Sequence, residues 1–218
     1  GDTDSVFVLL GSAASEEVSG IASRLVEQLN NWWRERLDSD YGIQSFLEME
    51  FETHFSKFLM PTVRGSNAGS KKRYAGLVVE DLEQGKFSML FKGLESVRSD
   101  WSPLAREFQK VLYERIFFDQ VYEDYIKQIV ADINAGKFEN ELVLRKRLRR
   151  KLSDYVKNIP PHAQAARKAE LVRKERGLPS LYQSGGWIEY IMTVNGAEPR
   201  QYRYSAIDYD FYIDRQLA

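Results

Sequence analysis

The chain has 218 residues, with 31 Lys plus Arg, 32 Asp plus Glu and no cysteine. The absence of cysteine excludes a disulfide framework and thiolate metal sites, and is typical of a reducing compartment. The longest apolar run, residues 6–10, is far too short to span a membrane, and the length allows one large domain or two small ones.

The charge is distributed unevenly. The formal net charge is −1, but residues 141–176 contain 12 Lys plus Arg and 4 Asp plus Glu, a balance of +8 that leaves −9 for the rest. Such asymmetry predicts one lobe that grips phosphates and another that holds acidic metal ligands or faces solvent.

Two carboxylates stand together in residues 1–5, Gly-Asp-Thr-Asp-Ser, ahead of a buried strand predicted over residues 5–10. Asp2 and Asp4 point to the same side if this stretch is extended. Carboxylates held this close repel one another unless a cation lies between them, and Mg²⁺ prefers oxygen ligands. The alternative is an ordinary turn in which the Asp side chains bond their own backbone.

A helix is expected to start near Ser15, because acidic residues follow it and apolar residues then recur at helical spacing as far as Leu37. We expect its apolar face to pack on a sheet, with Trp32 and Trp33 in the core. Residues 46–52 alternate apolar and acidic side chains, which predicts a half-buried strand. Its glutamates face solvent or, as the alternative, supply an accessory metal position.

A loop over residues 64–70 leads into a basic cluster at the start of a strand that is expected to end near Glu80. This strand is predicted to pair with residues 86–92 through a turn at residues 84–85. The cluster is a solvated strand edge or a binding site. Its members are Lys71, Lys72, Arg73 and Tyr74.

The second half is predicted to be mainly helical, with helices over residues 102–116, 121–134 and 163–176, and another from about Asp208. A strand is expected over residues 187–194. A basic run precedes the third helix and is expected to belong to the helical region; it is typical of a nucleic-acid contact, a localisation signal or a solvated face. Its members are Arg145, Lys146, Arg147, Arg149, Arg150 and Lys151.

These motifs together resemble the family B DNA polymerases, most closely their bacterial branch. Residues 1–5 resemble the third polymerase motif of that family, Tyr-Gly-Asp-Thr-Asp-Ser, without its leading Tyr, and residues 71–76 resemble the Lys-Lys-Arg-Tyr motif. The pattern continues in the palm-to-thumb stretch and the thumb, at residues 92–95, 98–104, 142–161 and 208–217.

The resemblance implies an α+β fold. Residues 1–98 would be the end of the palm domain, an antiparallel sheet remnant with a packed helix, which carries the metal-binding Asp turn and the Lys-Lys-Arg-Tyr strand. Residues 99–218 would be a mainly helical thumb domain, incomplete at its C-terminus.

The resemblance also implies template-directed DNA synthesis by two-metal-ion nucleotidyl transfer, in replication or repair. Of the two catalytic carboxylates, Asp4 would ligate the two Mg²⁺ ions directly, and Asp2 would be an auxiliary ligand or would support the site electrostatically. The basic cluster and the basic run would bind primer-template DNA. We expect this piece to be inactive alone, because a further palm Asp and the nucleotide-binding side chains of the fingers are not in it.

The implied partners are primer-template DNA and, for the full-length enzyme, deoxynucleoside triphosphates. A sliding clamp is a possible partner through a tail beyond Ala218, and no membrane is expected. The expected location is the bacterial cytosol and nucleoid. Two alternatives from the residues alone are a stand-alone duplex DNA-binding module and a metal-dependent phosphohydrolase or nuclease that uses Asp2 and Asp4.

Overall fold

The computed structural model divides the chain into two compact units, residues 1–92 (unit 1) and 93–218 (unit 2). Both units combine helices with antiparallel strands, so the predicted α+β class is confirmed. In the part of the chain that is described, no helix is long and apolar enough to cross a membrane. The described residues are 5–11, 17–62, 69–70, 72–81, 84–98 and 100–217, without the side chains of Asp81 and Glu95.

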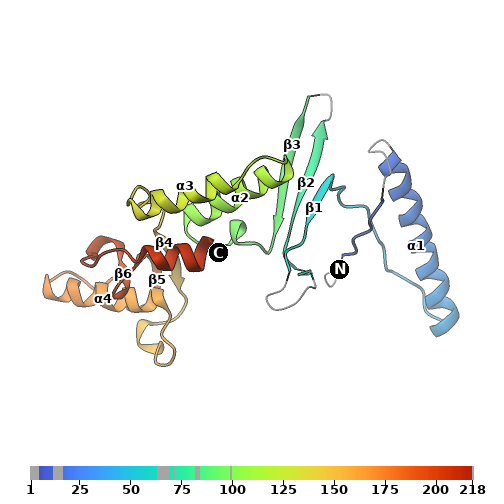
Figure 1. Ribbon diagram of the computed structural model, residues 1–218. Coiled ribbons are helices and arrows are strands. Elements are labelled where there is room, and N and C mark those ends of the chain that lie inside the picture. Colours follow the sequence, from blue (N-terminus) through green and yellow to red (C-terminus); the bar gives the residue numbers. More distant parts are fainter. Residues whose placement is uncertain are drawn as a thin grey trace. The chain divides into compact units, whose positions relative to one another are not determined.

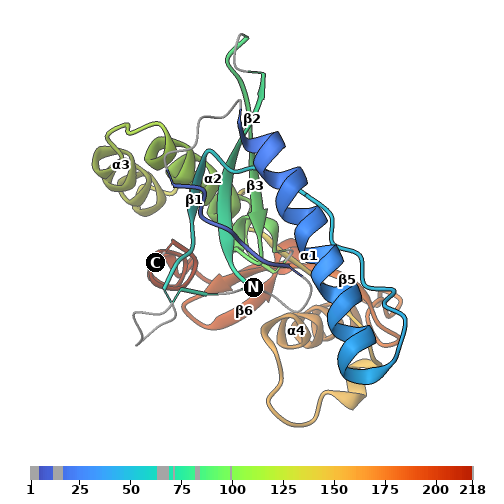
Figure 2. The same ribbon diagram turned by 90° about the vertical axis from the view of Figure 1, so that its right-hand side faces the viewer.

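Unit 1 contains an antiparallel sheet in the order β1-β2-β3. Its strands are β1 (Lys57–Leu59), β2 (Tyr74–Asp81) and β3 (Lys86–Lys92). Strands β2 and β3 form a long hairpin (Figure 2), and Gly85 in its turn has a φ of 61°, a conformation that glycine adopts without a steric cost. The hairpin predicted from the sequence is confirmed.

Aromatic rings fill the small core of unit 1. Phe58 lies at the centre, with ring centroids 5.0 Å from Phe7, 5.3 Å from Phe55 and 5.3 Å from Tyr74. Gly76 leaves room for this cluster, because a Cβ atom there would come within 2.1 Å of the Phe55 ring. The aromatic cluster therefore depends on glycine at position 76, because any side chain there would displace the Phe55 ring.

Helix α1 (Val18–Tyr41) ends at Gly42, which adopts the left-handed conformation with φ 62°. The predicted helix is confirmed, but the expected core position of the tryptophan pair is wrong for Trp32. Its side chain is 50% exposed and touches the edge of the neighbouring Trp33 at a centroid distance of 4.7 Å. Helical spacing marks a face as apolar, but it does not supply the surface that would cover it.

The extended segment 43–55, which leads from α1 to β1 (Figure 1), is fixed by one amide side chain. Asn30 of α1 donates to the carbonyl oxygen of Met49 at 3.0 Å and accepts from its backbone N–H at 2.8 Å. The side chain thus imitates a strand neighbour at a single position.

Two strands predicted in unit 1 are absent from the described residues. Ser5 makes one isolated bridge and residues 6–10 make no ladder, while Val8 is 53% and Leu9 95% exposed. Residues 46–52 form no strand ladder either. An alternating or apolar pattern describes only the side chains, and a strand also needs a neighbouring backbone to satisfy its N–H and C=O groups.

The first two helices of unit 2 follow their sequence signals. Helix α2 (Pro103–Phe117) begins after Ser102, whose hydroxyl accepts a 3.2 Å hydrogen bond from the N–H of Ala105, and Pro103 occupies its first turn. Helix α3 (Glu123–Asn134) ends before Gly136, which has a φ of 72°. Both predictions are confirmed.

A second antiparallel sheet, in the order β4-β5-β6, organises the rest of unit 2. Its strands are β4 (Leu144–Leu148), β5 (Gly186–Thr193) and β6 (Gly196–Pro199). The other elements are α4 (Pro161–Glu175), the single turn α5 (Tyr209–Tyr212) and a following π-helical turn (Ile213–Leu217). The predicted strand over residues 187–194 and the helices near 163–176 and from Asp208 are confirmed.

The helical interpretation of the basic run is wrong, because its first half is strand β4. The sequence Leu-Arg-Lys-Arg-Leu alternates, and the structure buries Leu144 and Leu148 while Arg145 and Arg147 are exposed. This is the period of two residues that strands follow. The strand therefore arranges the basic side chains in a flat row rather than around a helix.

Unit 2 has one continuous core, in which helices and sheet contribute side chains that are almost fully buried. Helix α4 contributes small side chains that allow close packing, since four of its alanines have no more than 1% exposure. Other central members are Ile133, Leu142, Leu148, Ile188 and Tyr212.

Candidate nucleic-acid interface

The predicted metal ligands Asp2 and Asp4 lie outside the described residues, as does Lys71 of the basic cluster. Within the described ranges, no group of three or more His, Asp or Glu side chains is placed to hold a metal ion. The candidate site that can be built from the described residues therefore consists of basic surfaces.

The basic cluster of unit 1 occupies the start of β2. Lys72 and Arg73 are exposed, whereas Tyr74 is only 7% exposed and belongs to the aromatic core. Lys92 lies directly opposite Tyr74 in the β2–β3 ladder, with its ammonium 6.0 Å from the centre of the Tyr74 ring. The strand end that carries these cations is thus joined to the aromatic core through the buried Tyr74.

One member of the basic run serves the fold. Lys146 lies 3.4 Å from Asp100, which also receives two hydrogen bonds from Arg98 at 3.0 and 2.9 Å. The hydrogen bonds from Arg98, together with the charges of Arg98 and Lys146, lower the pKa of Asp100 from 3.8 to about 2 although burial opposes this. Burial and, to a smaller extent, the charge of Lys146 lower the pKa of His162.

The arginines of β4 face an exposed tryptophan. Arg147 lies directly opposite Trp187 in the β4–β5 ladder, and Arg145 lies opposite Glu189. The guanidinium carbon of Arg145 is 4.7 Å from the centre of the Trp187 ring, a cation–π distance. Arg200 binds Glu189 at 3.1 Å, so the acid on this face is already paired.

The rest of the basic run follows β4 and is exposed. Arg150 lies over the ring of Tyr155 at 5.6 Å. Among the residues that the structure describes, Arg147, Arg149 and Lys151 find no carboxylate within ion-pair distance of their side chains. Exposed cations that have no internal partner remain available to external anions.

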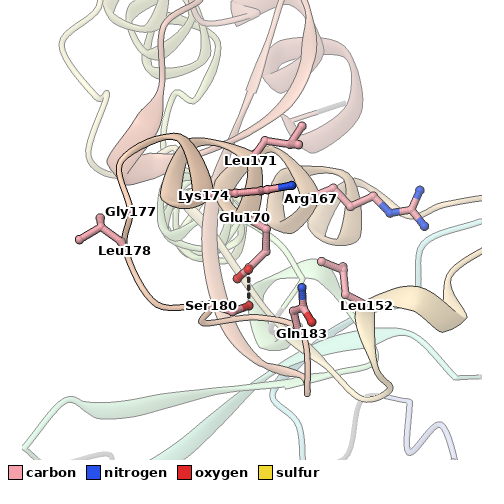
Figure 3. Close-up of a pocket in the computed structure, with 9 residues that line it drawn as sticks. All are labelled: Leu152, Arg167, Glu170, Leu171, Lys174, Gly177, Leu178, Ser180 and Gln183. Atoms are coloured by element: carbon pink, nitrogen blue, oxygen red, sulfur yellow. Dashed lines mark hydrogen bonds between the residues drawn. The ribbon is translucent and has the colours of Figure 1, made fainter.

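A surface pocket of about 690 Å³ lies beside α4. The carboxylate of Glu170 in this pocket is held by hydrogen bonds. It points to the loop after α4 (Figure 3), where it accepts from the hydroxyl of Ser180 and from the N–H groups of Leu181 and Tyr182. These bonds lower the pKa of Glu170 against the opposing effect of burial. Arg167 and Lys174 also line the pocket, which therefore has a basic rim and a carboxylate that is already held by hydrogen bonds.

Sequence reasoning missed two features of this surface. The alternation in Leu-Arg-Lys-Arg-Leu predicts strand β4, but the dense positive charge of this segment was given more weight than the alternation. The pairing of Arg147 with Trp187 was not predictable, because it depends on the register between strands about 40 residues apart in the chain.

The chain belongs to DNA polymerase family B, whose family model matches residues 1–218. It is 50% identical over 218 residues to DNA polymerase II of Escherichia coli, covering 100% of this chain and 27% of that protein. It is also 29% identical over 196 residues to a DNA polymerase of Archaeoglobus fulgidus, covering 88% of this chain and 20% of that protein. A DNA polymerase of Pyrococcus glycovorans is 28% identical over 227 residues, covering 99% of this chain and 26% of that protein.

The chain thus spans about a quarter of the length of these relatives. The expected membership of family B, with its likeness to the bacterial branch, is confirmed.

Proposed function

We propose that this chain is the part of a template-directed DNA polymerase that holds primer-template DNA, with residues 1–98 as the end of the palm and residues 99–218 as the thumb. The observation that carries the proposal is the row of exposed cations on and after β4, in a chain that belongs to DNA polymerase family B. A rigid strand fixes the spacing of its arginines, which suits the regular spacing of phosphates.

The charge of residues 141–176 is opposite in sign to that of the rest of the chain. Residues 141–176 carry a balance of +8 and the rest of the chain −9, so one region attracts the DNA backbone while another supplies carboxylates. Lys72 and Arg73 add cations at the start of a strand, where they would contact the duplex near the primer end. Tyr74 would support them from the aromatic core.

Asp2 and Asp4 would hold divalent metal ions, for which Mg²⁺ is our choice. Both side chains are hard oxygen donors, which fits this ion, and two such carboxylates need other ligands to bind it tightly. In the complete enzyme the metal ions would supply Lewis-acid stabilisation of the charge that develops at the phosphate. The chain by itself would then bind DNA without extending it. The intact enzyme would act in the bacterial cytosol and nucleoid, with deoxynucleoside triphosphates and a sliding clamp as partners.

The metal assignment is tested in the full-length enzyme by replacing Asp4 with Ala. Primer extension should fall by at least about a thousandfold, because the loss of one carboxylate weakens a two-ion site, while duplex affinity stays within about twofold of wild type. Asp38→Ala is the matched control, since Asp38 is an exposed carboxylate on α1. Extension at the wild-type rate would remove Asp4 from the metal site.

The DNA grip is tested in the 218-residue chain with a triple substitution, Arg147→Ala, Arg149→Ala and Lys151→Ala. A plot of log affinity for a primer-template duplex against log salt concentration should lose roughly one unit of slope for each phosphate contact removed, about three in total. The control removes the same charge elsewhere, by Arg24→Ala, Lys110→Ala and Lys127→Ala, at positions that are all exposed. Equal loss of slope in both variants would show that only net charge matters and would reject β4 as the contact.

A further inference from the structure

We infer that Trp187, with Arg145 and Arg147, forms a binding site for single-stranded DNA, in which an unpaired base stacks on the indole and the arginines hold the adjacent phosphates. The inference rests on the proposed function, because it places the site on the same basic surface. It goes beyond that function by separating a base-dependent contact from the phosphate grip.

The first observation is the exposure of a large aromatic ring on a rigid strand. Trp187 is 53% exposed, whereas its neighbours on β5, Ile188 and Tyr190, are 1% and 6% exposed and form part of the core. The strand is therefore anchored by its other face, and the indole is not needed to fill the interior. A ring held in this way loses little conformational freedom when a planar ligand stacks on it.

The second observation is the charge around the ring. Arg145 lies over one face of the indole at 4.7 Å, so a base stacks on the other face, and Arg147 is the direct ladder partner of Trp187. The nearby carboxylate of Glu189 is bound by Arg200, which also donates to the side-chain oxygen of Asn140 at 3.2 Å. The face around Trp187 therefore presents an aromatic ring and two cations, which is the combination that binds a base together with its phosphates.

The third observation is the fixed turn before the ring. Gly185, with a φ of 100°, lies so close to β4 that a Cβ atom added there would stand 2.8 Å from the carbonyl oxygen of Leu148. Gly186 follows with a φ of 119°, a conformation that glycine adopts without a steric cost. The two glycines therefore hold the turn against β4 and set Trp187 at the start of β5 without adding a side chain beside its ring.

The physical chemistry favours a single strand over a duplex. In a duplex the faces of each base are covered by the next base pair, so an indole on a flat sheet reaches only backbone and base edges. An unpaired base offers a free face, and stacking on an aromatic side chain typically contributes about 1–3 kcal/mol per base. The arginines bind phosphates in either form, so Trp187 is the residue that distinguishes them.

The test measures the affinity of the 218-residue chain for three labelled probes by fluorescence anisotropy. The probes are an oligodeoxythymidylate about 12 nucleotides long, an abasic strand with the same number of phosphates, and a blunt duplex. We expect Trp187→Ala to weaken binding of the thymidylate strand roughly tenfold, with unchanged binding of the abasic strand and the duplex. Trp187→Phe should retain most of the affinity, because a smaller ring still stacks.

The matched control is Trp32→Ala, which removes a tryptophan of similar exposure, 50%, from α1. This change should leave all three affinities as they are. Thermal unfolding of each variant, with a midpoint equal to that of the wild type, shows that no effect comes from loss of the fold.

The possible results separate the inference from the proposed function. Wild-type chain that binds the thymidylate and abasic strands equally, or a Trp187→Ala variant that weakens all probes alike or none, overturns the stacking site and leaves the phosphate grip standing as long as the duplex is bound. Wild-type chain that binds no probe at low salt overturns both.

Discussion

The two units differ in how much of their apolar surface they bury by themselves. Unit 2 encloses a continuous core of residues from all its helices and strands, with Ile133 at 0% and Tyr212 at 1% exposure. Unit 1 is held by a short sheet and one aromatic cluster, while apolar side chains such as Leu9 and Phe46 are 95% and 88% exposed. The comparison shows that helices and strands can form in a unit that does not bury all of its apolar side chains.

A domain that buries its own core can be stable without further segments, whereas exposed apolar faces indicate surface that another part of a protein covers. The relatives of this chain are about four times as long. We therefore expect the stability of unit 2 to depend on its own core, and that of unit 1 to rest on few contacts.

Ile133→Ala should have the largest effect, because this side chain is completely buried in unit 2. Its truncation removes apolar contacts and leaves a cavity, so the free energy of unfolding of unit 2 should fall by about 2–5 kcal/mol in a urea titration. The matched control is Leu9→Ala in unit 1, which should change the unfolding by less than about 0.5 kcal/mol because the side chain is 95% exposed. Equal effects would contradict the contrast between the units.

The sequence predicted unit 2 better than unit 1, for a physical reason. Helix α2 carries its signals locally, with the cap at Ser102 and Pro103 after it, and Gly136 ends α3 in the same way. Residues 6–10 and 46–52, which were expected in strands, have the right side-chain pattern but form no strand ladder among the described residues. Local signals determine helices, whereas strands depend on neighbours elsewhere in the chain.

The candidate site shows the same limit. Its basic residues could be predicted from the sequence, because a dense run of charge is visible in any conformation. The separate roles of two adjacent members could not, since Lys146 binds Asp100 while Arg147 faces Trp187. The strand pairing of β4 decides which side chain points to which face, and that pairing is a long-range property.

Gly76→Ala tests whether the aromatic cluster is the core of unit 1. A Cβ atom would stand 2.1 Å from the Phe55 ring, so the ring must move and the cluster must repack, at a cost of about 1–3 kcal/mol in the stability of unit 1. Gly20→Ala on α1 is the control, because a Cβ atom there meets nothing within 4 Å and alanine favours the helix. If the two variants unfold alike, the cluster does not hold the unit together.

Asp100→Asn is expected to have the smallest effect, and the effect depends on pH. The pKa of Asp100 falls from 3.8 to about 2 in the folded chain, so its ion pairs with Arg98 and Lys146 stabilise unit 2 above pH 3.8 and this contribution disappears as the pH falls towards 2. The carboxylate is partly exposed, which screens the pair, so we expect the variant to be less stable by roughly 1 kcal/mol at neutral pH.

The measurement is the difference in free energy of unfolding between wild type and variant along an acid titration. Asp124→Asn provides the control, because this carboxylate is 86% exposed and lies 3.7 Å from Lys127, a geometry that contributes little. A difference that persists unchanged at pH 2 would mean that Asp100 stabilises unit 2 by shape and not by charge. Lys146 would then have no role as an ion-pair partner, although it would still lie on the opposite face of β4 from Arg145 and Arg147.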